Sequence, residues 1–122
     1  MNETTPLDPS KQFVAAVIPL LKEYLEKLRS IAEEAQRIRE VFAKERLDKE
    51  KKRILTLKYD LLTQLFKRLS PPATQLAQEV SQRIEHGKLD ELDRVELMLR
   101  LAEYEHALLS LPRVFSMGPL AA

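Results

Sequence analysis

Residues 17–42 carry a heptad pattern of apolar side chains that constrains the fold of this chain more than any other feature of its sequence. The apolar positions are spaced alternately four and three residues apart: Val17, Leu21, Tyr24, Leu28, Ile31, Ala35, Ile38 and Phe42. Such spacing gives an α-helix one apolar side and is typical of helices that pack lengthwise against other helices. A helix over these residues extends about 39 Å at 1.5 Å per residue, so the sequence predicts one long helix that needs partners.

Two prolines mark where this helix begins and where it is disturbed. Asp8 followed by Pro9 is typical of an N-cap residue and of the first helical position, where the missing proline N–H leaves no hydrogen bond unmade. Pro19 lies within the apolar run that follows, so we expect a kink there or a restart of the helix near Ile18.

A charged stretch and a second apolar run follow. Residues 44–53 contain neither glycine nor proline, so they form either the loop of a helical hairpin or a solvated part of one very long helix. A compact fold favours the hairpin. Residues 54–69 are apolar over more than half of a helix circumference, which predicts a helix that is buried on more than one side.

Two further helices are predicted downstream. The Ser-Pro-Pro motif at 70–72 is expected to end the second helix and to begin a third, which ends before Gly87. Asp90 is expected to cap a fourth helix, which ends at Pro112.

Length and composition favour a single all-α domain. The chain has 122 residues, 44% of them hydrophobic and only 6% aromatic, which suits a helical core of aliphatic side chains. Two glycines are too few for the turns of a β-rich fold. We therefore predict a three- to four-helix bundle with a long heptad-patterned first helix. Residues 1–8 are expected to be a disordered arm, 9–111 the bundle domain and 112–122 an apolar tail.

Several features favour a soluble protein of the cytoplasm. The sequence contains no cysteine, which excludes disulfides and thiolate metal sites and suits a reducing compartment. Residues 1–10 lack the basic and apolar regions of a signal peptide, and no apolar run approaches the roughly 18 residues of a membrane span. No membrane association and no cofactor are expected.

The charges are unevenly distributed along the chain. The net charge is +1, but residues 44–69 carry nine basic and four acidic groups, and residues 70–110 carry four basic and eight acidic groups. The simplest expectation is that these two segments pack as neighbours and screen each other.

The predicted fourth helix carries two apolar seams on roughly opposite sides. One seam is Leu92, Val95, Leu99, Ala102, His106 and Leu109, and the other is Leu97, Leu101, Tyr104, Leu108 and Leu111. A helix at the edge of a bundle needs only one apolar seam. Either this helix is central in the fold, or one of its seams is buried against another chain.

We therefore predict a non-enzymatic interaction protein: an adaptor, a chaperone or an assembly subunit that binds a protein partner or itself. The expected partner anchors are Leu97, Leu101, Tyr104, Leu108 and Leu111. Binding would place one helix in a groove of another. A homo-oligomer is expected, and Leu101→Glu would then reduce oligomer mass without loss of helix; unfolding of this variant would instead identify the seam as internal core.

A small subunit of a nucleoprotein complex is the first alternative. Its expected phosphate contacts are Lys49, Lys51, Lys52 and Arg53. Binding of this kind weakens steeply with salt. No aromatic side chains are interleaved with these residues to stack on bases.

A dimeric carboxylate metal protein is the second alternative. Glu103 and His106 form an E-x-x-H motif, whose spacing places a carboxylate and an imidazole on one helix face, as in di-iron bundles. The other ligands of such a site are missing from the chain, so a second copy would have to supply them. Elemental analysis for iron or manganese tests this alternative.

Two other features leave alternatives open. Lys58 lies inside the apolar arc of the second helix, where its stem either runs along the helix to solvent or pairs with a glutamate of the fourth helix. The apolar residues of the tail either dock on a partner or fold back over the bundle: Val114, Phe115, Met117 and Leu120.

Overall fold

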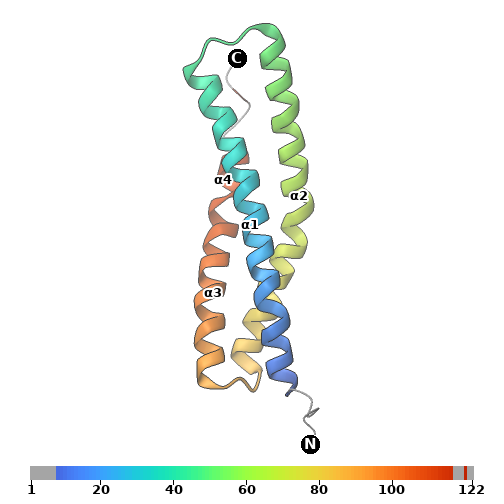
Figure 1. The fold of residues 1–122 in the computed structure, drawn as a ribbon, viewed down its shortest axis with the longest axis vertical. Helices are drawn as coiled ribbons and strands as arrows, with labels where there is room; N and C mark the ends of the chain where they lie inside the picture. Colours follow the sequence, from blue (N-terminus) through green and yellow to red (C-terminus); the bar gives the residue numbers. More distant parts are fainter. Residues whose placement is uncertain (1–7, 117–119, 121–122) are drawn as a thin grey trace, which may run out of the picture.

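The computed structural model describes residues 8–116 and Leu120, and within these residues the chain is an all-α bundle, as predicted. Three long helices, α1 (Pro9–Lys44), α2 (Lys49–His86) and α3 (Glu91–Ser110), precede the short α4 (Pro112–Phe115). Figure 1 shows α1 and α2 as a long hairpin and α3 along only one half of it. The predicted arm before Asp8, and Met117 of the tail, lie outside the described residues.

Helix α1 begins where the sequence predicts. The Asp8 side chain accepts a hydrogen bond of 3.0 Å from the Ser10 N–H, and Pro9 occupies the first turn. The helix does not restart at Pro19, which is exposed and lies within the continuous helix. The predicted heptad seam faces inward: Tyr24 and Phe42 are half-buried and the other six side chains are buried.

The expectation of a helix end at the Ser-Pro-Pro motif is wrong, because α2 continues through Pro71 and Pro72 to His86. The prolines have no N–H to donate to the carbonyls four residues earlier, but their fixed φ is close to the helical value. Burial then holds the helix together, since its second half buries Ala73, Leu76, Ala77 and Val80 in the main core. Figure 1 shows this half passing behind α1 toward α3. A bend in α2 is the expected effect of two prolines.

The hairpin between α1 and α2 is confirmed, with a shorter connection than the charged stretch predicts. Only residues 45–48 lie between the two helices, and Lys49–Arg53 form the first turn of α2. Asp48 caps this turn, because its side chain accepts a hydrogen bond of 2.8 Å from the Lys51 N–H.

The core has two parts along the length of the hairpin. The larger part is built by α1, the second half of α2 and α3, and contains Leu28, Val80 and Leu97 with essentially no exposed surface. The smaller part lies in the half that α3 does not reach, where Ala35, Ile38 and Tyr59 pack against Val114, Phe115 and Leu120. The described tail residues thus fold back over the hairpin.

Polar contacts fix α4 in this position. The Val114 carbonyl accepts hydrogen bonds from the Arg39 Nε–H and from the Tyr59 hydroxyl, both at 2.9 Å. The Phe115 ring lies 4.9 Å from the Phe66 ring and 5.8 Å from the Tyr59 ring, centroid to centroid. These contacts use the inward side of α2 and leave its opposite side uncovered.

The amino end of α3 is bound to the first turn of α1 and to the carboxyl end of α2. Asp90 caps it by accepting a hydrogen bond of 2.9 Å from the Asp93 N–H, and the same two carboxylates receive the Lys11 ammonium of α1. Arg94 donates to the carbonyls of Ile84 and Gly87, which satisfies the carboxyl end of α2.

Tyr104 joins α3 to α2 inside the core. Its side chain is fully buried, and its hydroxyl donates a hydrogen bond of 2.8 Å to the Ala73 carbonyl, immediately after the two prolines. Burial raises the pKa of the Tyr104 hydroxyl, and the nearby Tyr24 adds to the shift. The folded protein therefore favours the neutral phenol of Tyr104 over the phenolate.

The variant Tyr104→Phe tests this contact. We expect it to lower the free energy of unfolding by about 1 kcal/mol at neutral pH, because one buried hydrogen bond is lost. The unfolded tyrosine ionises near pH 10, whereas the folded one resists ionisation, so its contribution is complete below pH 10 and lost as the pH rises toward the folded pKa. Urea unfolding followed by circular dichroism at about pH 7, 9 and 11 measures both effects. If the free energy of unfolding falls equally at high pH in Tyr104→Phe and in the unchanged protein, the loss does not come from ionisation of Tyr104.

Candidate interaction surface

Helix α2 carries a row of exposed apolar side chains along the half of the hairpin that α3 does not cover. We call Ile54, Leu57, Leu61 and Leu65 the α2 stripe. These side chains are between 46% and 60% exposed. At 100° per residue they fall within an arc of about 80°, so they form one continuous side of the helix.

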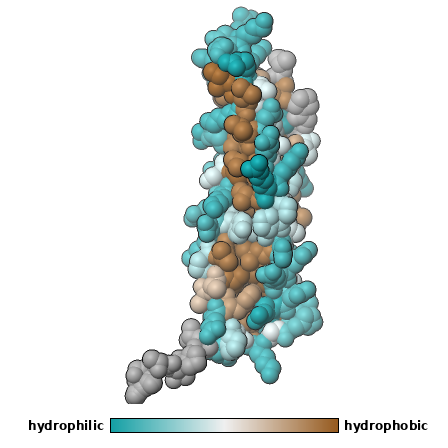
Figure 2. Space-filling view, turned by 90° about the vertical axis from the view of Figure 1, so that its right-hand side faces the viewer, coloured by the Kyte–Doolittle hydropathy of each residue, from teal (hydrophilic) through white to brown (hydrophobic). Residues whose placement is uncertain are grey.

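The exposure of the α2 stripe corrects the expectation that residues 54–69 are buried on more than one side. Only Tyr59 and Phe66 of this run are buried, and both face α1 and α4. The opposite side has no covering element among the described residues, because α1 and α4 pack on the side of Tyr59 and Phe66. Figure 2, which views the molecule from the α2 side of Figure 1, shows an apolar column along this half.

Helix α3 buries the seam that the sequence analysis assigned to a partner. Its inner seam consists of Leu97, Leu101, Tyr104, Leu108 and Leu111; the first three are buried and the last two are half-buried in the main core. A folded single copy therefore does not offer these anchors to another protein. The physical reason is bulk: four leucines and a tyrosine fill the space between α1 and α2.

The opposite seam of α3 is the exposed one. This outer seam consists of Leu92, Val95, Leu99, Ala102, His106 and Leu109, all of which are exposed. Met98, beside it, is 51% exposed. The presence of His106 and a small alanine was the signal in the sequence that this seam, and not the bulkier one, faces away from the core.

The basic and acidic segments do not screen each other as expected. The ion pairs of α3 with other helices run to α1, from Asp90 and Asp93 to Lys11 and from Glu103 to Arg29. The basic segment begins at the loop end of the hairpin, whereas α3 lies along the other half (Figure 1). The molecule therefore has a basic end and an acidic side.

Lys58 reaches solvent beside the α2 stripe, and its partner is on α1. Its ammonium lies 2.7 Å from the Glu34 carboxylate, and its side chain is half exposed. This hydrogen bond holds the pKa of Glu34 below its ordinary value, and Arg37 contributes in the same direction. The glutamate that pairs with Lys58 is thus not on the predicted fourth helix.

Three residues of the basic run line one open depression at the end of the hairpin. Lys49, Lys52 and Arg53 surround it together with Phe42, Leu57, Tyr59 and Leu120, among others. Its volume is about 740 Å³. Glu50 and Asp60 share the rim, and Arg53 is paired with Glu50 at 2.8 Å. The floor of this depression is apolar and its rim carries both positive and negative charges, so it is poorly suited to bind phosphate. Lys51 does not line the depression.

The E-x-x-H motif is on the outside of α3. Glu103 lies 3.6 Å from Arg29, and His106 is exposed on the outer seam. Within the described part of the chain, no group of three or more histidines and carboxylates is placed to hold a metal ion. Metal binding through these two residues stays a prediction that requires ligands from another chain.

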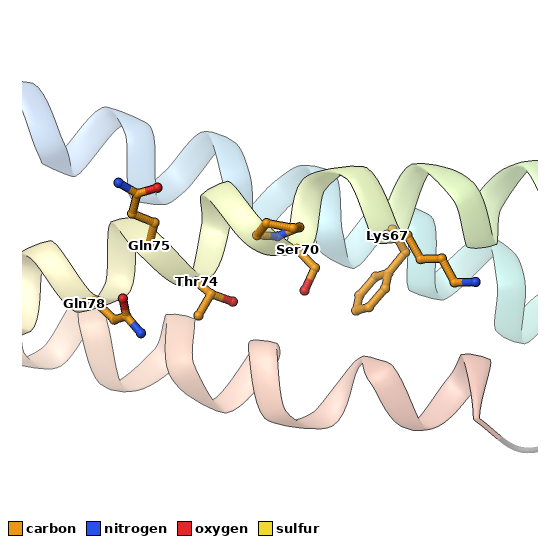
Figure 3. A pocket seen from close by; sticks show the side chains of 7 residues that line it. Lys67, Ser70, Thr74, Gln75 and Gln78 are labelled. Atoms are coloured by element: carbon orange, nitrogen blue, oxygen red, sulfur yellow. The ribbon is translucent and has the colours of Figure 1, made fainter.

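A second depression lies at the proline pair on α2 (Figure 3). Its volume is about 650 Å³, and it is lined by Phe66, Lys67, Ser70, Pro71, Thr74, Gln75 and Gln78. Figure 3 shows Lys67 and Gln78 at opposite ends of it, with Ser70 and Thr74 between them. These side chains offer hydrogen bonds, but neither a nucleophile beside a base nor a pair of carboxylates.

In comparisons with known proteins, no family model, no curated protein and no solved structure matches this chain. None of the helices over residues 8–116 is both long enough and apolar enough to span a membrane. The α2 stripe and the outer seam of α3 are the features from which a function can be inferred.

Two leucines on opposite sides of α3 test the assignment of inner and outer seams. Leu101 is 6% exposed and Leu99 is 68% exposed, so Leu101→Glu buries a charge whereas Leu99→Glu exposes one. We expect Leu101→Glu to lower the free energy of unfolding by more than about 3 kcal/mol and Leu99→Glu to change it by less than about 0.5 kcal/mol. Urea unfolding at a concentration where the protein is monomeric measures both; similar losses there would show that both seams are buried within one copy.

Proposed function

We propose that this chain is a non-enzymatic interaction protein of the cytoplasm, an adaptor, chaperone or assembly subunit, whose docking surface is the α2 stripe. The observation that carries the proposal is a row of four large aliphatic side chains on α2 that are about half exposed, with no described element packed over them. Exposed apolar rows of this kind mark interaction sites in soluble proteins.

The shape of the α2 stripe suits an α-helical partner. Its side chains are spaced three, four and four residues apart, which matches the repeat by which one helix packs its apolar side along another. Complete burial of an exposed leucine is worth roughly 1.5–3 kcal/mol. Because these side chains are already about half buried, their complete burial by a partner contributes on the order of 1 kcal/mol for each side chain to the free energy of binding.

The charges beside the α2 stripe favour an acidic partner. Lys51 and Lys58 flank it on one side, Arg53 and Asp60 flank it on the other, and Glu50 and Arg68 lie in its line at either end. Glu34 pairs with Lys58 and Glu50 pairs with Arg53, so this border keeps a small net positive charge. Acidic side chains on either side of an apolar helix would complement this border. The partner that we propose is an amphipathic helix with aliphatic anchors and glutamate or aspartate along its flanks.

A designed peptide tests the proposal directly. We expect a labelled three-heptad peptide with leucine at a and d and glutamate at e and g to bind the chain, measured by fluorescence anisotropy. Leu61→Glu should weaken binding at least tenfold, because a charge then stands in the middle of the row. Leu20→Glu, an exposed leucine of α1, is the matched control and should bind as the unchanged protein does.

A second peptide with lysine at e and g separates charge from hydrophobicity. It should bind more weakly than the glutamate peptide, and the difference should shrink as salt rises, because the flanking charges are exposed. If Leu61→Glu binds the glutamate peptide as tightly as the unchanged protein, the α2 stripe is not the docking surface.

A further inference from the structure

The outer seam of α3 has the properties required of the partner of the α2 stripe. It is apolar along one side from Leu92 to Leu109, about 26 Å at 1.5 Å per residue, whereas the α2 stripe spans about 17 Å. The outer seam is therefore long enough to cover the whole of the α2 stripe.

The charges that border the outer seam are mainly acidic. Glu96 and Glu103 lie on one side of it and Glu105 on the other, and Glu91 lies in its line at the amino end. Glu96 pairs with Arg100 and Glu103 pairs with Arg29, and Arg94 donates to the carbonyls at the end of α2, so the border keeps more acidic than basic groups. The border of the outer seam thus complements the basic border of the α2 stripe.

One copy cannot bring these two surfaces together. The α2 stripe lies on the half of the hairpin near the α1–α2 loop, and α3 lies along the other half (Figure 1). The inner seam of α3 faces α1 and α2, so its outer seam faces away from them. The α2 stripe faces the opposite side of the molecule, the side seen in Figure 2.

We infer that the α2 stripe of one copy binds the outer seam of α3 of a second copy. This inference rests on the proposed function, because it names the acidic amphipathic helix that the α2 stripe accepts. The two surfaces differ, so the contact is head to tail, and each copy has one free surface of each kind. Assembly therefore proceeds to open chains of several copies rather than stopping at a symmetric dimer.

The contact is small, so assembly depends on concentration. A helix pair in contact over about 17 Å covers less than the roughly 800 Å² per partner of a standard stable interface. Exposed charges border the contact, so about 0.5 M salt should weaken it. In sedimentation velocity we expect the average mass of the unchanged protein to rise with concentration beyond two copies.

Two single variants and their mixture test the head-to-tail contact. Leu61→Glu blocks the α2 stripe, and Leu99→Glu blocks the outer seam; both side chains are exposed, so both variants should stay folded by circular dichroism. Each variant alone should remain at the 14.1 kDa of one chain. An equimolar mixture should form a dimer of about 28 kDa, twice the chain mass, because one intact surface of each kind is then present. Leu20→Glu should assemble as the unchanged protein does.

Other outcomes overturn the inference in distinguishable ways. If Leu99→Glu still self-associates while Leu61→Glu does not, the α2 stripe binds its own counterpart and the role of the outer seam is wrong. If the unchanged protein is monomeric at every concentration but binds the glutamate peptide, the second copy is wrong and the partner is another protein. If it also fails to bind the peptide, the proposed function is wrong as well.

Discussion

Burial of the apolar side of α1 against α2 is the interaction on which the rest of the structure depends. The seam runs from Val14 to Ile38, and within the described part of the chain α2 is the only other helix long enough to follow it. The 20 residues of α3 cover one half of this hairpin, and the four of α4 cover part of the other. Because α1 and α4 both pack against the side of α2 that carries Tyr59 and Phe66, the opposite side, which carries the α2 stripe, stays in water.

Polar contacts determine how the covering helices sit on this hairpin. The Tyr104 hydroxyl binds the Ala73 carbonyl where the prolines interrupt the hydrogen bonding of α2, and Arg94 closes the end of the same helix. At the other half, Arg39 and Tyr59 hold the Val114 carbonyl. These bonds orient α3 and α4 with their bulky sides inward. The acidic border of α3 and the basic end of the hairpin are thereby held apart, and our proposed contact between two copies depends on this separation.

Most of the fold was predictable because helix signals are local. Heptad spacing over residues 17–42, the caps at Asp8 and Asp90 and the end of α3 before Pro112 depend only on neighbouring residues. The proline pair at 71 and 72 misled the prediction, since a local rule ends the helix there. Tertiary burial of Ala73, Leu76, Ala77 and Val80 outweighs that local preference. The separation of the basic and acidic segments could not be predicted from the sequence either, because it depends on where α3 lies along the hairpin.

The sequence by itself determined that α3 has two apolar seams and that residues 54–69 are apolar over more than half of the helix circumference, because helical periodicity assigns each side chain an angle about the helix axis. Only the tertiary structure decided which of those sides faces inward. That choice depends on the volume between α1 and α2, which four leucines and Tyr104 fill, and on a distant carbonyl that accepts the Tyr104 hydroxyl. Neither the volume nor the carbonyl has a position until the three helices are packed together.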